Sequence, residues 1–180
     1  MQSVPMKKLL YILSFFILAF SLEGCGSHKV DEHAKAMEYK EQYIQILRST
    51  GRPGMEEVIR QLEATDFFTM EAGNHHKIEG GLVKHSLEVY RIMRCFAWFQ
   101  SSDSIAIVAL FHDMGKYDLG GWHTWRSVFH LTEWGLKLTA EEYIAIFRHH
   151  NLEFKYYRHP LHRALVVADA ISTGWWLLWH

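Results

Sequence analysis

Residues 101–116 read SSDSIAIVALFHDMGK, and this stretch decides the fold. The side-chain oxygens at its start can cap a helix. The apolar residues that follow recur at helical spacing and share one face with His112. Gly115 can end this helix in a left-handed turn. The stretch therefore predicts a helix with an apolar face that carries a histidine–aspartate pair, His112 and Asp113, to its C-terminal end.

The rest of the chain has the same helical character, and strand-like alternation is nowhere sustained. Residues 139–142 read TAEE, which is a capping box at the start of a helix. The helix that this box begins covers residues 140–149. The other predicted helices cover residues 31–48, 55–64, 82–96 and 160–173. The sequence therefore predicts an all-α protein with a single compact helical domain over residues 25–180.

Composition narrows the range of functions. The chain has 180 residues, 49% hydrophobic and 22% charged, which predicts about one ordinary globular domain. A formal net charge of −1 argues against strong nucleic-acid binding, because phosphate contacts require an excess of Lys and Arg. Two cysteines cannot supply a disulfide framework. Thirteen histidines stand beside only six aspartates, and histidine is the commonest metal ligand.

Residues 1–24 are interpreted as a targeting segment and not as part of the fold. Lys7 and Lys8 precede a nearly unbroken apolar run, residues 9–20. A basic start and a short apolar run are typical of a secretory signal peptide, and the run is short for a spanning helix. The residues that end at Cys25 resemble a bacterial lipoprotein processing site, in which the cysteine becomes the lipidated first residue. We therefore expect a lipid anchor to the membrane on its extracytoplasmic side, with a cytoplasmic protein as the alternative.

A second aspartate lies in an apolar run. Asp169 stands within LVVADAI, residues 165–171, on the last predicted helix. A buried carboxylate needs a cation or hydrogen-bond donors. A metal ion supplies that need, and a salt bridge to an arginine such as Arg163 is the alternative.

The order of these residues resembles the HD superfamily of metal-dependent phosphohydrolases. His85 comes first, the pair His112 and Asp113 follows, and Asp169 comes last. The likeness runs over residues 67–172, well over half of the chain. Four positions in the right order, each with matching neighbours, make a specific pattern.

The likeness is closer to one subgroup of that superfamily. Its members carry a segment similar to HKIEGGLVKHSL, residues 76–87, and then a helix that ends in His-Asp-x-x-Lys, here ALFHDMGK at residues 109–116. The stretch LKLTAEE, residues 136–142, is also similar to the subgroup. The resemblance implies an HD-type helical domain.

The resemblance implies that one metal ion is held by four residues: His85, His112, Asp113 and Asp169. Members with two metals add histidines, and the matching positions here are His123 and His149, so that Asp113 bridges the ions. His123 follows a glycine pair in what we expect to be a loop, and His149 ends an amphipathic helix. His150 is the rival of His149, since one of the two is expected to bind metal while the other packs or meets solvent. We favour His149.

Other histidines receive weaker assignments. His76 matches a histidine of the subgroup and is expected to line the pocket. His162 lies two helical turns before Asp169 on the same face, so a position at the border of the site is open to it, as is an ordinary structural role. His130 is expected to be a partly buried packing residue.

The resemblance further implies hydrolysis of a phosphoester, in a nucleotide, by a metal-bound hydroxide. Asp113 and Lys116 are the expected catalytic residues, Lys116 because its ammonium can lie near the phosphate; a solvated lysine is the alternative. Arg148, Arg158 and Arg163 are weaker candidates for holding the substrate. Imidazole and carboxylate suit Mn, Fe, Co, Ni or Zn, and Mg also remains open.

Two other functions stay open at this stage. One is a non-catalytic HD-like module that binds a metal or a nucleotide. The other is an HD nuclease that acts on nucleic-acid ends. The near-zero net charge favours a small phosphorylated substrate over nucleic acid.

Overall fold

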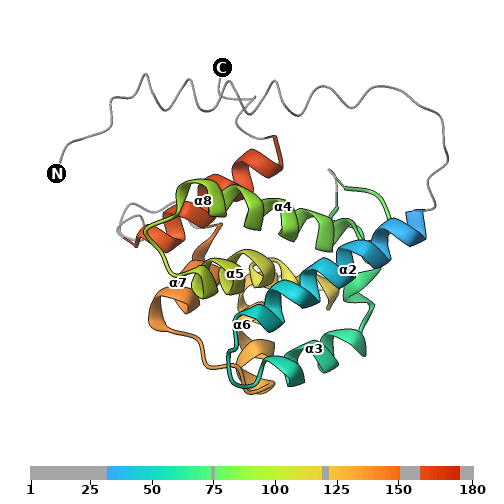
Figure 1. Cartoon of the computed structure of the whole chain (residues 1–180), viewed down its shortest axis with the longest axis horizontal. Helices are drawn as coiled ribbons and strands as arrows, with labels where there is room; N and C mark the ends of the chain where they lie inside the picture. Colours follow the sequence, from blue (N-terminus) through green and yellow to red (C-terminus); the bar gives the residue numbers. More distant parts are fainter. Residues whose placement is uncertain (1–31, 74–75, 119–121, 151–158, 175–180) are drawn as a thin grey trace. The chain divides into compact units, whose positions relative to one another are not determined.

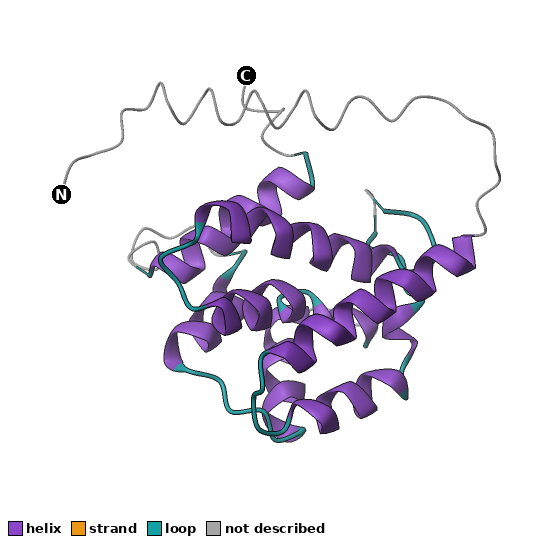
Figure 2. Cartoon of the chain, viewed as in Figure 1, coloured by secondary structure: helices purple, strands orange, loops and turns teal. Residues whose placement is uncertain are grey.

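Helices account for the regular structure in the part of the chain that the computed structural model describes, which is residues 32–73, 76–118, 122–150 and 159–174. Over these ranges the chain forms seven α-helices and two short 3-10 helices, and they contain no strand (Figure 2). The predicted all-α fold is confirmed. The predicted targeting segment, Cys25 and Arg158 lie outside the described residues.

The α-helices follow one another in the order shown in Figure 1: α2 (Glu32–Ser49), α3 (Met55–Glu63), α4 (Gly81–Phe96), α5 (Ser102–Phe111), α6 (His123–Glu133), α7 (Ala140–Arg148) and α8 (Pro160–Ser172). The 3-10 helices are η1 (Asp66–Phe68) and η2 (Met114–Tyr117). All the α-helices except α6 match a predicted range to within a few residues. The predicted capping box of α7 is present, with Thr139 and Glu142 each accepting the other's backbone N–H.

Helix α5 lies in the middle of the bundle and is packed against α2, α4, α7 and α8 (Figure 1). Every residue from Ile105 to Phe111 is buried. The predicted apolar face is buried, and the other faces of the helix are buried as well, as expected of a helix that is apolar on all sides. Because neighbours cover α5 along its length, its C-terminal end carries His112 and Asp113 into the interior of the domain.

The chain leaves α5 at His112 and turns at once into η2. Gly115 does not adopt a positive φ, so the predicted left-handed turn at this residue is wrong. Its small size permits a close approach instead, because a Cβ at Gly115 would overlap the carbonyl oxygen of His123. The N–H of Gly115 donates to Ser127 Oγ at 2.8 Å. Helix α6 is thus held directly against η2.

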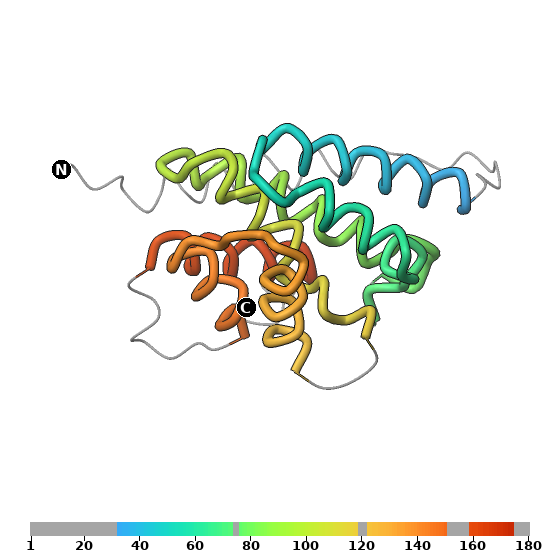
Figure 3. Tube along the Cα trace, turned by 90° about the horizontal axis from the view of Figure 1, so that it is seen from below, coloured from blue at the N-terminus to red at the C-terminus, as the bar shows by residue number. Residues whose placement is uncertain are grey.

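Figure 3 shows α6, α7 and α8 gathered on one side of the bundle and α2 on the other. Helix α7 packs against both α6 and α8. This arrangement places the N-terminus of α6 and the C-terminus of α7 near the C-terminus of α5. None of the described helices combines the length and the apolar character that crossing a membrane requires.

Candidate metal centre

The elements around the end of α5 bring all six predicted ligand positions together. His85 comes from the second turn of α4, and Asp169 comes from α8. His149 directly follows the last residue of α7. His123 is the first residue of α6 and not a loop residue as predicted.

The first group consists of His85, His112 and Asp169, whose ligand atoms all lie within 4.8 Å of one another. The Nε2 atoms of the two histidines are 3.2 Å apart. Asp169 Oδ1 lies 3.2 Å from His85 Nε2 and 3.8 Å from His112 Nε2. Among the described residues Asp169 forms no salt bridge with Arg163, so that alternative is not realised there.

The second group consists of four residues within the same 4.8 Å limit: Asp113, His123, His149 and His150. Asp113 Oδ1 lies 3.2 Å from His123 Nε2 and 3.5 Å from His149 Nε2. His150 Nε2 lies 2.9 Å from His123 Nε2. Both neighbouring histidines therefore lie within reach of the group, and the preference for His149 stays a prediction.

Asp113 joins the two groups. Its Oδ2 lies 3.5 Å from the Nε2 atoms of both His85 and His112, while its Oδ1 faces the second group. The residue is only 2% exposed. Each oxygen of one buried carboxylate thus serves a different set of histidines, which is the arrangement of a ligand that bridges two cations.

Hydrogen bonds at Nδ1 decide which nitrogen of each ring faces these groups. His112 Nδ1 lies 2.9 Å from the carbonyl oxygen of Ala109, and His149 Nδ1 lies 2.8 Å from that of Ile146. A carbonyl oxygen only accepts, so in both rings Nδ1 carries the proton. Each Nε2 therefore presents a lone pair to the groups.

Ser172 has the same effect on His85. Its hydroxyl donates to the carbonyl oxygen of Asp169 at 2.9 Å, so it accepts from His85 Nδ1 at 3.2 Å. The lone pair at His85 Nε2 then faces that of His112 across 3.2 Å, beside two carboxylates. Such an arrangement is repulsive unless a cation lies among the lone pairs.

Two buried atoms of the centre also lack a hydrogen-bond partner among the described residues. Asp113 Oδ1 and His149 Nε2 have no well-aligned hydrogen bond within the described ranges, although both atoms are buried. A buried polar atom without a partner is destabilising by about 1–3 kcal/mol. A divalent metal ion would satisfy both atoms, so the residues present fit this cofactor.

The protonation states agree with that fit. Burial lowers the pKa of His112 to about 3, so its ring is neutral near pH 7. Burial by itself would raise the pKa of Asp113, but the Lys116 ammonium beside its Oδ2 helps to hold it well below its usual range. Neutral imidazoles and ionised carboxylates are the forms that bind metal.

The structure places the other predicted residues at and around the centre. Lys116 lies at its edge, with Nζ paired to Asp113 Oδ2. His76 borders the first group, because its ring centroid is 6.1 Å from that of His85 and its Nε2 lies 3.0 Å from Glu88. Arg148 lies over the ring of Phe147, its neighbour in the chain.

Two other histidines lie outside the groups. His162 is buried and donates from Nε2 to the carbonyl oxygen of Arg148 at 2.9 Å, which ties α8 to the end of α7 just before His149. His130 packs as predicted, with its ring stacked on Trp134 at 5.2 Å.

Two serines escaped prediction. Ser172 orients His85, and the available signal was its position one helical turn after Asp169. Ser127 is buried four residues after His123, and its Oγ lies 3.0 Å from the carbonyl oxygen of His123 and 3.2 Å from that of His112. It therefore couples the start of α6 to the end of α5.

Comparison with known proteins agrees with this geometry. No curated protein and no solved structure matches the chain. The family model described as HD domain matches residues 82–173, slightly more than half of the chain and all of the residues that form the two groups. This chain belongs to the HD domain family.

Proposed function

We propose that this protein is a metal-dependent phosphohydrolase that cleaves a phosphoester of a nucleotide. The observation that carries the proposal is Asp113, whose two carboxylate oxygens face two separate groups of histidine nitrogens. Membership of the HD domain family supports the reaction class.

The residues that would hold a first ion are His85, His112, Asp113 and Asp169. Those that would hold a second are Asp113, His123, His149 and His150. Nitrogen and carboxylate donors suit Mn, Fe, Co, Ni or Zn. When bound, such ions would supply hydroxide at neutral pH and offset negative charge on a phosphate oxygen.

The exposure of the side chains around the centre indicates the side from which a substrate can enter. The side chains of Lys116, His123 and Asp169 are 30%, 23% and 19% exposed, whereas those of His85 and His112 are at most 1% exposed. Substrate therefore approaches from the side of Lys116, whose ammonium can attract a phosphate. The positive end of α6 lies on the same side, because His123 is its first residue and no side chain caps it.

The experiment that tests the proposal measures turnover by the full chain loaded with Mn²⁺. Nucleoside monophosphates, cyclic nucleotides and single-stranded oligonucleotides are supplied in parallel, and the products are measured. We expect hydrolysis of a nucleotide, which the substitution Asp113→Ala abolishes together with metal binding. The matched control is Asp66→Ala, an exposed aspartate in η1 that should retain full activity.

The other outcomes are distinct. Metal binding without turnover of any substrate would identify a non-catalytic module, and cleavage of oligonucleotides alone would identify a nuclease. Full activity in Asp113→Ala, or in metal-stripped protein, would overturn the proposal.

We also propose export with a lipid anchor at Cys25, supported by the composition of residues 1–24. A mass spectrum of the mature protein should show a lipidated Cys25 at the N-terminus. An intact Met1 would contradict export.

A further inference from the structure

Helix α6 begins with an unusual backbone. Trp122, its N-cap residue, has φ 76° and ψ 32°, and it is the one non-glycine residue with a positive φ in the described ranges. Helices α3 and α4 also begin with left-handed N-caps, but theirs are Gly54 at φ 89° and Gly80 at φ 71°. A side chain in this conformation is unfavourable by about 1–2 kcal/mol. The chain therefore keeps a tryptophan where two equivalent positions use glycine.

Packing does not offset that strain. Trp122 is 83% exposed, so its ring gains little from burial. Its carbonyl oxygen accepts the N–H groups of Trp125 and Arg126, which fixes the backbone at the start of α6. The backbone that carries the ring is thus fixed, while the ring itself is exposed on the surface and contributes nothing to the core.

That place is the rim of the metal centre. Trp122 directly precedes His123, so their Cα atoms are about 3.8 Å apart, and His123 Nε2 lies 3.2 Å from Asp113 Oδ1. The aromatic surface continues along α6, where Trp125 and Phe129 are stacked at 4.9 Å and remain 45% and 43% exposed.

We propose that Trp122 stacks against the base of a nucleotide whose phosphate lies at the two groups joined by Asp113. This inference rests on the proposed function and names what selects the substrate. Every base has a π face, so stacking on an aromatic ring is tolerant of base identity. Trp122 should therefore separate phosphoesters that carry a base from those that do not, with little preference among bases.

The test compares AMP and CMP with ribose 5-phosphate, which has the phosphoester but no base. The measured quantity is the ratio of kcat/KM for nucleotide over ribose 5-phosphate, using the Mn²⁺-loaded full chain. Trp122→Ala should lower this ratio about tenfold, the size of one base–aromatic stack, while Trp122→Phe retains most of it. Trp98→Ala is the matched control, because Trp98 is also 83% exposed.

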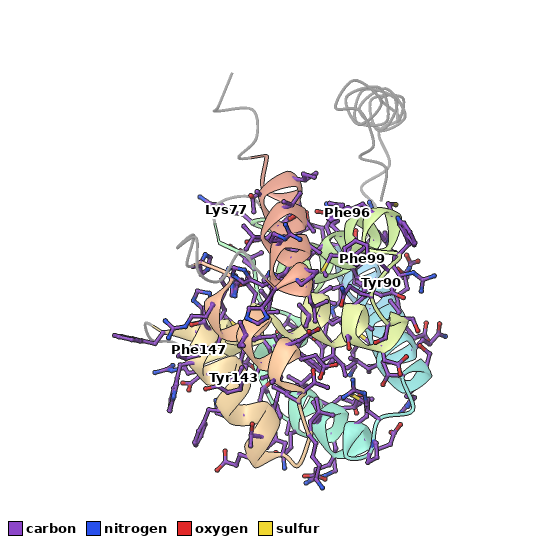
Figure 4. All side chains as sticks on the ribbon, turned by 90° about the vertical axis from the view of Figure 1, so that its left-hand side faces the viewer. Lys77, Tyr90, Phe96, Phe99, Tyr143 and Phe147 are labelled. Carbon is purple, nitrogen blue, oxygen red and sulfur yellow. The ribbon has the colours of Figure 1, made fainter. Side chains whose placement is uncertain are left out.

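Trp98 is suitably remote from α6. Its ring partner is Phe99, at 6.1 Å. Figure 4 shows Phe99 on the opposite side of the view from Tyr143 and Phe147 of α7, the helix that packs on α6. Trp98→Ala should leave the ratio unchanged.

Two further measurements separate stacking from unfolding and from failure of the proposed function. Trp122→Gly should keep Tm at or above that of the parent, because glycine adopts this backbone freely, and should still lose the nucleotide preference. Calorimetric binding of adenosine needs no turnover, and its Kd should rise about tenfold in Trp122→Ala. Unchanged adenosine binding, or an unchanged ratio in a folded Trp122→Gly protein, would overturn the inference even if the enzyme is active.

Discussion

The position of one proton on each imidazole determines whether the centre can accept a cation. His112 and His149 both follow the last residue of a helix, where carbonyl oxygens have no partner within the helix. Each ring donates from Nδ1 to the carbonyl three residues earlier. His85 lies within α4, where those carbonyls are used by the helix, and it relies on the hydroxyl of Ser172.

Ser172→Ala should therefore weaken metal binding about tenfold, the lower end of the effect of removing a hydrogen-bond partner from a metal-ligating histidine. Titration of metal-free protein with Mn²⁺ measures this. Thr173→Ala is the control, because Thr173 Oγ1 also donates to the carbonyl oxygen of Asp169, at 2.9 Å, whereas the hydroxyl that His85 Nδ1 contacts is that of Ser172. An equal loss in both variants would contradict orientation of His85 by Ser172.

At this scale the sequence could predict the ligand types and their order, and the structure brings those six positions together. It could not indicate Ser172 or Ser127, because a serine on a helix face is compatible with many neighbours. The preference for His149 over His150 came from the resemblance of the stretch after Thr139 to the subgroup, which places His149 at the ligand position. Helix α7 ends at Arg148, so both histidines lie beyond its last residue, and a resemblance in sequence cannot tell which of them reaches the group.

At the scale of elements, the helices that could be predicted were those whose sequences contain a capping residue or a clear pattern of apolar residues. Helix α7 carries a capping box, whereas α6 begins at a strained tryptophan without a side-chain cap. The sequence therefore contained no start signal for α6, and its polar and aromatic residues gave no clear apolar face. The contact between η2 and α6 depends on the close approach of Gly115 to the backbone of α6, which the sequence alone does not show.

Gly115→Ala should destabilise the protein by about 2–3 kcal/mol, because its Cβ would overlap backbone atoms of His123 and Ser127. Urea unfolding measures the change in free energy. Gly135→Ala is the control, since Gly135 has φ 88° but open space around its Cβ, and it should lose only about 1 kcal/mol. Equal losses in the two variants would argue against tight packing between η2 and α6.

Glu142 links α7 to the segment that contains Arg52 and to Ser104 of α5. It is fully buried, pairs with Arg52 and accepts a hydrogen bond from Ser104 Oγ at 2.7 Å. Glu142→Ala should lower the free energy of unfolding by about 3 kcal/mol, since it removes a cap and leaves Arg52 without its carboxylate. The exposed neighbour Glu141 provides the control, and Glu141→Ala should change stability little. A stable Glu142→Ala protein would contradict this role.

At the scale of the whole molecule, the buried histidines link stability to pH. Unfolded His112 takes up a proton near pH 6.5, whereas burial keeps the folded ring neutral down to about pH 3. The unfolded state binds more protons across that interval, so stability is fully present above pH 6.5 and is lost as pH falls.

Metal-free protein should therefore lose on the order of 2 kcal/mol between pH 7.5 and pH 5 through His112. Urea unfolding at the two pH values measures the loss, and His112→Asn should reduce it. An equal free energy of unfolding at both values in the parent protein would show that His112 is not kept neutral by burial.

The central claim is that one buried carboxylate joins two metal sites, and metal content tests it most directly. The full chain and Asp113→Ala are loaded with Mn²⁺ and desalted, and the metal per chain is measured by mass spectrometry. The parent should retain two equivalents, because both groups are complete, and Asp113→Ala should lose metal from both. One equivalent in the parent, or the same content in the two proteins, would contradict a bridging Asp113.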